Sequence, residues 1–408
     1  MTSGDVLDAP GVTGPGVPDA SGTTVTLCRD PRAFAALAPE WDRLHRSCGA
    51  ATPFQSHAWL ESWWRSYGAE GRLRVVLARR NGRLIGAAPL TLVHRPMPLL
   101  VPLGGAISDY GDLVVDDGHA EQALRALARG LERAARHAVI DLREVRPGAV
   151  AERLYEEWGG PRARLDDSVC MELPALPLEE LVRRMPRSRA QRARANLRRL
   201  QALGVAAATV PAADVPASVD RMLTLHELQW RGRGVNVEHL RPRFRAHLVR
   251  AVTRMTAGDE ATLTEFRMDG EVVAVGLALR SAGLSGSYLY GAHPVLRERK
   301  ADIATMLMAE EARQAAGRDL AVLSMLRGSE PYKNHWRPEA VTSGRLLLAR
   351  PALEPLLRLH ESRARMRDRA AEMVRTRLPA AREWRGRLND WRAEGTSVRT
   401  AAQPPRGG

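Results

Sequence analysis

Two segments of the chain share one pattern of apolar and polar positions, in which a tight turn separates two apolar runs. Asn81-Gly82 forms the turn of the first segment, and Asp269-Gly270 forms that of the second. Asn-Gly and Asp-Gly between apolar runs are strong signals for a β-hairpin. A further apolar strand, a segment with helical spacing and a last strand follow each hairpin. These patterns predict an internal duplication of a hairpin–strand–helix–strand unit.

The elements after each hairpin occupy corresponding positions. Residues 121–136 and 302–317 have apolar side chains at helical intervals, which predicts a helix in each unit. Strands are expected directly afterwards, at 138–145 and 319–325. The fold class that follows is α/β, with two tandem domains that each have a mostly antiparallel central sheet and flanking helices.

Composition marks the expected domain boundaries. The beginning of the chain is rich in Gly, Pro and Asp, which is typical of a disordered segment, and an Arg-rich helix separates the duplicated units. We expect six segments: a disordered leader (1–22), an N-terminal domain (23–180), an Arg-rich linking helix (181–204), a C-terminal domain (205–350), a basic helical tail (351–395) and a disordered end (396–408).

Two stretches account for the net charge of +14. Residues 181–200 hold eight arginines and no acid, and residues 358–392 hold eleven arginines and five acids. Local basic elements favour contacts with nucleic acid, phosphorylated ligands or an anionic membrane surface. A solvated helix face is the simpler interpretation of the second stretch. The first would suit an RNA backbone, although few aromatic residues lie among its arginines to stack on bases, and DNA is not an expected partner.

Composition also excludes several classes of protein. No apolar run reaches the roughly 20 residues that span a bilayer, so no transmembrane segment is expected. The N-terminus lacks the basic start and apolar core of a secretory signal. Cys28, Cys48 and Cys170 are far apart and odd in number, so neither a disulfide framework nor a zinc site is expected. We therefore expect a cytoplasmic protein without a metal cofactor.

The chain has only two lysines among its 61 basic residues, Lys300 and Lys333. A lysine retained against an arginine-rich background suggests a site that needs a compact, mobile ammonium group, although two chance surface lysines would look the same. Lys333 lies in the least generic motif of the chain, RGSEPYKNHW at 327–336.

Four segments, taken together, resemble one known family. They are TPFQSHAWLESWW (52–64), LGGAISDYGDLVV (103–115), RSRAQRARANLRRLQALG (187–204) and RGSEPYKNHW (327–336). From about Thr23 to about Leu348 the chain resembles the CelD/BcsL-like acetyltransferase family of the GNAT superfamily, and more distantly the Fem-type aminoacyltransferases. The resemblance implies that both domains are GNAT-like and that acetyl-CoA, or another acyl-CoA, is the co-substrate.

The resemblance also implies where acyl-CoA would bind. A splayed strand at 285–291, including Tyr290 and Gly291, would bond to the pantetheine arm as to an added strand. The next loop would hold the pyrophosphate at a helix N-terminus. This loop, HPVLRERKADIATML, contains no glycine, so side chains would have to compensate. The loop residues expected to contact the cofactor are Arg297, Arg299, Lys300 and Ala301.

Acyl transfer to an amine gives the motif at 327–336 a chemical interpretation. We expect Tyr332 to protonate the leaving group, Lys333 to polarise the carbonyl or hold a substrate anion, and Glu330 to act as a base. A core tyrosine, a surface ion pair and an unremarkable exposed glutamate are the alternatives. The expected substrate contacts are Asp109, Tyr110, Arg327 and Trp336, of which Asp109 could instead cap a turn and Trp336 could be a packing residue.

The expected function is an N-acyltransferase that moves an acyl group from acetyl-CoA or acyl-CoA to an amine. The acceptor class, a sugar, polysaccharide precursor or envelope-related metabolite, comes from the resemblance alone. Two alternatives remain: a Fem-like enzyme that takes its acyl group from aminoacyl-tRNA, and a non-catalytic GNAT-like binding protein, which the glycine-free loop keeps open.

Overall fold

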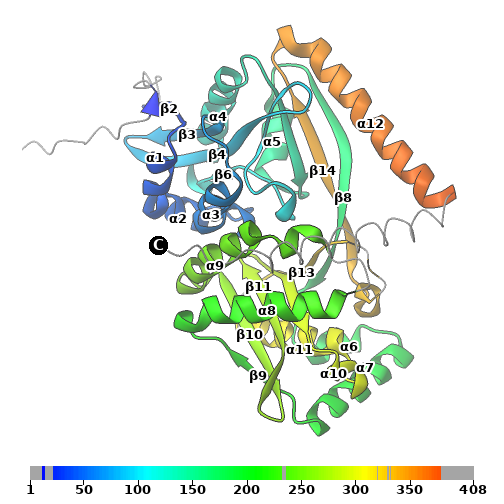
Figure 1. Ribbon diagram of the computed structural model, residues 1–408. Coiled ribbons are helices and arrows are strands. Elements are labelled where there is room, and N and C mark those ends of the chain that lie inside the picture. The colour runs from blue at the N-terminus through cyan, green and yellow to red at the C-terminus, as the bar shows by residue number, and fades with distance from the viewer. Residues whose placement is uncertain are drawn as a thin grey trace, which may run out of the picture. The chain divides into compact units, whose positions relative to one another are not determined.

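Two compact units make up the structure, a computed structural model that describes residues 12–13, 22–231, 236–318, 320–328, 330 and 332–377 (Figure 1). Within these residues, unit 1 comprises Met1–Val169, Ser281–Gly283 and Val341–Ser362, and unit 2 comprises Cys170–Arg280, Leu284–Ala340 and Arg363–Gly408. The expected disordered end (396–408) and most of the expected leader (1–22) lie outside the described residues.

The two units do not coincide with the expected domains 23–180 and 205–350. Strand β8 (Arg162–Pro174) begins in unit 1 and ends in unit 2, so the chain changes unit within a strand, where no shift in composition marks the place. Strand β14 (Glu339–Leu348) then returns to unit 1. The Arg-rich segment forms α6 (Leu178–Arg183) and α7 (Arg187–Ala202), which belong to unit 2 instead of forming a separate linker.

A mostly antiparallel sheet forms the centre of unit 1, with the strand order β1-β2-β3-β4-β5-β7-β14 and with β6 beside β4. The parallel pair is β5 with β7. The first hairpin is confirmed, because Asn81 and Gly82 both have positive φ angles, 49° and 80°. Besides β8 and β14, the strands are β1 (Val12–Thr13), β2 (Thr23–Cys28), β3 (Leu73–Arg80), β4 (Arg83–His94), β5 (Pro98–Pro102), β6 (Val114–Val115) and β7 (Val139–Val145).

Helices cover the sheet of unit 1 through their apolar faces. In α4, the predicted stripe of Leu124, Leu127 and Leu131 is fully buried. A Cβ on Gly130 would lie 2.4 Å from Val76, so glycine lets α4 approach the strands closely. The α-helices of this unit are α1 (Pro31–Ala36), α2 (Ala38–Arg46), α3 (His57–Tyr67), α4 (Ala120–Ala134) and α5 (Val150–Glu157).

The sheet of unit 2 has the strand order β8-β13-β12-β11-β10-β9, with β12 and β13 as its parallel pair. Asp269 and Gly270 have φ angles of 54° and 83°, which confirms the second hairpin. The remaining strands of this unit are β9 (Ala206–Thr209), β10 (Ala261–Met268), β11 (Glu271–Arg280), β12 (Leu284–Ala292) and β13 (Val322–Arg327).

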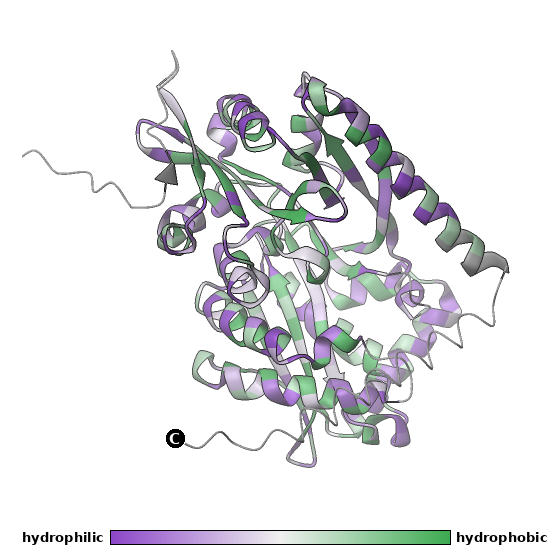
Figure 2. Ribbon diagram, turned by 45° about the horizontal axis from the view of Figure 1, so that its top comes forward, coloured by the Kyte–Doolittle hydropathy of each residue, from purple (hydrophilic) through white to green (hydrophobic). Residues whose placement is uncertain are grey.

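Two helices pack on opposite faces of β11 and β12. A Cβ on Gly291 would lie 2.2 Å from the Met222 carbonyl oxygen of α8, and a Cβ on Gly276 would lie 3.1 Å from Leu307 of α11. Figure 2 shows hydrophobic residues along the strands and a mixture of hydrophobic and hydrophilic residues on the helices. The helices that complete unit 2 are α8 (Val215–Trp230), α9 (Pro242–Ala257), α10 (Val295–Glu298) and α11 (Ile303–Ala316). The predicted α/β class, with mostly antiparallel GNAT-like sheets and flanking helices, is confirmed.

Short 3-10 turns connect many of these elements. They are η1 (Pro53–Gln55), η2 (Gly105–Ile107), η3 (Asp117–His119), η4 (Ala212–Asp214), η5 (Val237–Leu240), η6 (Lys333–Trp336) and η7 (Pro351–Leu353).

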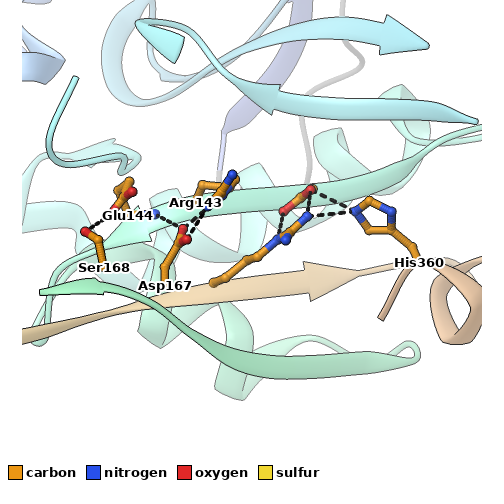
Figure 3. A network of polar contacts seen from close by, with 7 residues as sticks. Arg143, Glu144, Asp167, Ser168 and His360 are labelled. Atoms are coloured by element: carbon orange, nitrogen blue, oxygen red, sulfur yellow. Dashed lines mark hydrogen bonds and ion pairs between the residues drawn. The ribbon is translucent and has the colours of Figure 1, made fainter. Parts of the chain in front are cut away.

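A buried ionic network fixes the last helix, α12 (Glu354–Arg377), to unit 1. Arg345 of β14 donates to both carboxylate oxygens of Asp141 in β7, at 2.8 and 2.6 Å, and His360 of α12 contacts the same carboxylate at 2.9 Å (Figure 3). Burial alone would raise the pKa of Asp141, but the hydrogen bonds from His360 and Arg345 lower it to about 2. The carboxylate is therefore ionised at neutral pH and orients His360.

Candidate functional site

Strands β12 and β13 separate after a short parallel contact. The pairing joins Leu284, Ser285 and Gly286 to Val322, Leu323 and Ser324. Beyond Gly286, β12 follows β11, whereas the end of β13 follows β8. The two strands therefore part after Gly286, within the segment 285–291 in which a splay was predicted.

Irregular backbone accompanies the splay on both strands. Leu326 has a φ of 56°, which is unusual for a side-chain-bearing residue, and the register of β13 shifts next to it. On β12, Tyr288 is the extra residue of a bulge against β11. A Cβ on Gly286 would lie 2.8 Å from the Leu326 side chain, so glycine makes room for leucine where the strands part.

Side chains of α8 occupy the edge of β12 that faces the splay. The amide of His293 donates to Val273 of β11, so the alternate residues Tyr290 and Ala292 direct their backbone groups away from β11. His226 Nδ1 donates to the Tyr290 carbonyl at 2.7 Å, and the Ala292 amide donates to Gln229 Oε1 at 3.0 Å.

These contacts determine which ring nitrogens of two neighbouring histidines carry a proton. Because Nδ1 of His226 donates to Tyr290, its Nε2 accepts from Nδ1 of His239, at 3.1 Å. Burial lowers the pKa of His226, and burial together with the neighbouring His226 lowers the pKa of His239 to about 3. Both rings are neutral near pH 7 and serve as hydrogen-bonding groups.

A buried glutamate approaches the splay from α11. Ser287 of β12 donates a hydrogen bond to Glu311 Oε1, while Glu311 Oε2 is shielded from solvent and has no hydrogen-bond partner among the described residues. Burial raises the pKa of Glu311 to about 7, against the opposing effect of the Ser287 hydrogen bond. A carboxyl group in this state can take or give a proton at neutral pH.

Tyr332 belongs to the same electrostatic cluster. Burial raises the pKa of its phenol, and the nearby Tyr290, Glu330 and Glu311 raise it further. The hydroxyl therefore keeps its proton at neutral pH and can donate it. The Tyr290 hydroxyl itself accepts from Gln229 Nε2 at 3.1 Å.

Lys333 is a buried structural cation. Its side chain is only 4% exposed, and Nζ contacts the carbonyl oxygens of Arg327 at 2.9 Å and Gly328 at 3.2 Å. The half-exposed Glu330 pairs with Nζ at 2.9 Å. These partners surround the ammonium at the turn after β13, and its expected role toward a substrate stays a prediction.

The remaining expected residues of the motif differ in accessibility. Trp336 is 3% exposed and lies in the protein interior, as a packing residue does. Arg327, at the end of β13, is half-buried. That the side chains of Arg327 and Trp336 contact the substrate remains a prediction.

The loop that was expected to hold pyrophosphate forms hydrogen bonds within itself. Every backbone amide from Val295 to Ala301 donates within the segment 293–301, and the Asp302 side chain accepts from the Thr305 amide at the start of α11. No amide of 295–301 is left to cradle a phosphate in this structure. The side chains of Arg297, Arg299 and Lys300 remain exposed, whereas Ala301 is buried.

The arginines of α6 and α7 border this site at two points. Arg189 donates to the Asn334 carbonyl beside Tyr332, at 2.9 Å, and Arg199 donates to the Arg299 carbonyl in the loop, at 3.0 and 2.7 Å. The exposed arginines of the segment are Arg183, Arg184, Arg187, Arg189, Arg192, Arg194, Arg198 and Arg199. They form a basic surface that extends from the Tyr332 segment to the loop.

The expected substrate contacts in unit 1 have different surroundings. Tyr110 is 1% exposed, and its ring packs edge-on against Phe54. Its carbonyl accepts from Gln55, so the residue anchors the core of unit 1. Asp109 is half-buried and stays a predicted contact. In the same motif, Asp112 accepts from two amides at the start of α5, and burial raises its pKa to about 7.

Sequence reasoning missed Glu311, Ser287, His226 and Gln229. A signal for Glu311 exists, because it follows Ile303 and Leu307 on the apolar stripe of its helix. An acid at such a position is buried or paired. The other three residues carry no comparable signal. Among the described residues, no group of three or more His, Cys, Asp or Glu side chains could hold a metal ion.

Part of the chain and its overall fold resemble known proteins. Residues 187–334 match the family model described as an acetyltransferase (GNAT) domain. The structure resembles that of FemX, with a TM-score of 0.57 and 13% identity over 79% of this chain and 98% of the other. It also resembles a conserved protein of unknown function from Bacteroides thetaiotaomicron VPI-5482, with a TM-score of 0.51 and 11% identity over 78% and 97% of the two chains. No curated protein matches the sequence. Residues 187–334 therefore match a GNAT acetyltransferase domain, and the fold of the chain resembles that of FemX.

Proposed function

We propose that unit 2 transfers an acyl group to an amine acceptor at the splay between β12 and β13. The observation that carries the proposal is the cluster of Glu311, whose pKa burial raises to about 7, and Tyr332, whose pKa burial raises above its ordinary value. One can accept a proton at neutral pH, and the other holds one ready to donate. Such a pair suits the two proton transfers of acyl transfer.

The proposed reaction uses each group once. The acceptor nitrogen forms a bond to the acyl carbonyl carbon and releases its proton to Glu311 Oε2. The bond from that carbon to the leaving group then breaks, and the leaving group takes the proton of Tyr332. A proton passing back from Glu311 to Tyr332, directly or through solvent, restores both groups. Ser287 positions Glu311, and Lys333 holds the turn that carries Tyr332.

The donor that fits these surroundings best is an aminoacyl ester carried on RNA. A tyrosine with a raised pKa is a weak acid, well matched to the alkoxide of a ribose but poorly matched to a thiolate, whose pKa is about 8.5. The edge of β12 is occupied by His226 and Gln229, which disfavours a pantetheine arm added as a strand. The basic surface of α6 and α7 suits a phosphodiester backbone.

Acyl-CoA remains the competing donor. The family model matched by residues 187–334 is that of an acetyltransferase domain, and the exposed Arg297, Arg299 and Lys300 could reach a pyrophosphate through their side chains. The proposed acceptor is an amine on a sugar, polysaccharide precursor or envelope-related metabolite. Membership of the CelD/BcsL-like family is also proposed. A cytoplasmic location, where both donors occur, is part of the same proposal.

Binding measurements with both donors separate the two hypotheses. Fluorescently labelled tRNA should bind with an affinity that falls steeply as salt rises, and Arg192→Gln with Arg194→Gln should weaken it. A matched control replaces two arginines of α12, Arg365→Gln with Arg367→Gln, and should bind tRNA as the native protein does. Calorimetric titration with acetyl-CoA should show no binding. Micromolar acetyl-CoA binding that Lys300→Ala abolishes would overturn the RNA donor in favour of acyl-CoA.

Failure of the catalytic proposal itself would look different. If consumption of both aminoacyl-tRNA and acetyl-CoA, with a panel of amino sugars as acceptors, is the same for the native protein and for Glu311→Gln, no transfer at this site takes place. The alternative of a non-catalytic GNAT-like binding protein would then apply.

A further inference from the structure

Helix α12 has two faces of different character. Leu357, His360 and Ala364 are buried, at 0%, 3% and 1% exposure, and form the face that packs against the protein. At 100° per residue, the exposed apolar residues lie outside this face, all but Leu356 on roughly the opposite side of the helix. They are Leu356, Leu359, Met366 and Met373, at 36%, 43%, 59% and 56% exposure. These four are named the apolar stripe.

Charges are sorted around this stripe. Arg358, Arg365 and Arg369 follow one margin, Arg367 lies at the other, and Arg363 lies within the stripe, between Leu356 and Leu359. The described acids Glu354, Glu361 and Asp368 lie on the side away from the stripe. Figure 2 shows the resulting alternation of hydrophobic and hydrophilic residues along α12. An apolar stripe with arginines at both margins is the pattern of a helix that lies in the interface of an anionic membrane.

The arrangement favours a lipid surface over a second copy of the chain. Leu356, Leu359, Arg363, Met366 and Met373 follow a heptad-like spacing, which could also suggest a helical dimer. In such a dimer, Arg363 would lie in the apolar seam, and Arg367 and Arg369 would flank it in both helices, so like charges would face each other. At a membrane the same arginines reach up to phosphates while the apolar side chains enter the bilayer.

The orientation of the stripe is fixed by the rest of the protein. The contact of His360 with Asp141, which is itself bound to Arg345, sets the rotation of α12 about its axis (Figure 3). From Leu356 to Met373 the stripe extends over roughly 25 Å. No helix in the described part of the chain is long and apolar enough to cross a membrane. We propose that α12 is a docking surface for an anionic phospholipid bilayer, on which the helix lies parallel to the membrane plane.

Co-sedimentation of the full chain with lipid vesicles tests the proposal. Binding to mixed phosphatidylcholine–phosphatidylglycerol vesicles should exceed binding to phosphatidylcholine alone by at least about tenfold and should weaken with salt. Leu359→Ser combined with Met366→Ser should reduce it about tenfold or more. These residues are exposed, so the melting temperature should not change, which separates lost docking from lost folding.

Matched variants distinguish docking by α12 from general attraction of a basic protein. Arg365→Gln with Arg369→Gln should weaken vesicle binding, whereas Arg192→Gln with Arg194→Gln, an equal charge change on α7, should leave it unaltered. Equal losses in the two variants would overturn the proposal. So would equal binding to both kinds of vesicle, or a light-scattering mass showing a dimer that Leu359→Ser with Met366→Ser dissociates. Loss of tRNA binding in the α12 arginine variant, with vesicle binding retained, would assign the surface to RNA instead.

Discussion

Gln229 of α8 accepts a hydrogen bond from the backbone amide of Ala292 in β12, at 3.0 Å. A side chain thus takes the place that a neighbouring strand would occupy at this edge. Because Gln229 is only 5% exposed, its loss leaves the amide of Ala292 and the hydroxyl of Tyr290 without this partner.

The first prediction concerns this contact. Gln229→Ala should lower the free energy of unfolding by about 1–3 kcal/mol, since buried polar groups lose their partner. Urea denaturation measures the change. Gln201→Ala on the exposed side of α7 serves as the control and should stay within about 0.5 kcal/mol of the native protein. An equal, small effect in both variants would mean that water replaces Gln229 freely.

The second prediction concerns Glu311 as the base. Glu311→Gln keeps the shape but not the proton affinity, so kcat should fall about 10²–10⁴-fold. In the native protein, kcat/KM should rise with pH around the pKa of about 7, and this limb should vanish in the variant. Glu310→Gln is the neighbouring control. Because Glu310 raises the pKa of Glu311, this variant should keep the limb and move its midpoint to lower pH.

The third prediction concerns folding stability. Whereas kcat/KM should rise with pH, the stability that Glu311 contributes should fall as pH rises. Its pKa rises from an ordinary value of about 4.3 in the unfolded chain to about 7 in the folded one, so the folded state binds the proton more tightly. Stability contributed in this way is present at low pH and is lost as pH rises from about 4.3 through 7. Glu311→Gln should therefore gain in melting temperature over the native protein at pH 8 and lose that gain at pH 5. A constant difference between the two proteins would contradict the raised pKa.

The fourth prediction separates Tyr332 as an acid from Tyr332 as a packing residue. Tyr332→Phe removes only the hydroxyl, and transfer from a ribose ester should slow by about 10²-fold or more, because the alkoxide leaves unprotonated. An activated acyl donor such as a p-nitrophenyl ester needs no such proton. Its reaction should be nearly unaffected in the same variant. Equal slowing with both donors would indicate that Tyr332 only shapes the site.

The fifth prediction concerns Lys333 as a structural cation. Lys333→Ala would leave the carbonyl groups at the end of β13 unpaired, and the unfolding free energy should drop by about 2–4 kcal/mol. Lys333→Arg should not restore it, since a planar guanidinium does not match a site built around a compact ammonium. Chemical denaturation of both variants provides the measurement. A stable, inactive Lys333→Ala protein would instead support the direct role in catalysis that the sequence suggested.

Much of the fold was predictable because its signals are local. The turns at Asn81-Gly82 and Asp269-Gly270 need left-handed backbone, which these residue pairs adopt readily. The duplication that they mark extends further than the sequence suggested. In each unit the strand after the hairpin pairs in parallel with the last strand of the repeat, β5 with β7 and β12 with β13. A left-handed residue stands one position before the end of β7 and of β13, at Glu144 and Leu326.

The chemistry of the site was harder to predict, because it depends on contacts between distant segments. The rarity of lysine in the chain drew attention to Lys333. Neither its burial nor its carbonyl partners could be predicted from the sequence. Glu311 acquires a pKa near neutrality mainly through burial, at a place where it contacts Ser287, 24 residues earlier in the chain. The division into units differs from the expected domains for a related reason. No local signal marks a strand such as β8 that is shared between two units.

The return of β14 to unit 1 has a consequence for synthesis of the chain. Leu346, Leu347 and Leu348 are fully buried there, opposite β7. They emerge from the ribosome only after Cys170–Arg280 and Leu284–Ala340 of unit 2. Until then, the nascent N-terminal half lacks an interior strand and exposes the edge of β7, so its sheet is completed last although it is translated first. The order of folding should therefore differ from the order of the sequence, with unit 2 acquiring its structure before the sheet of unit 1 is complete.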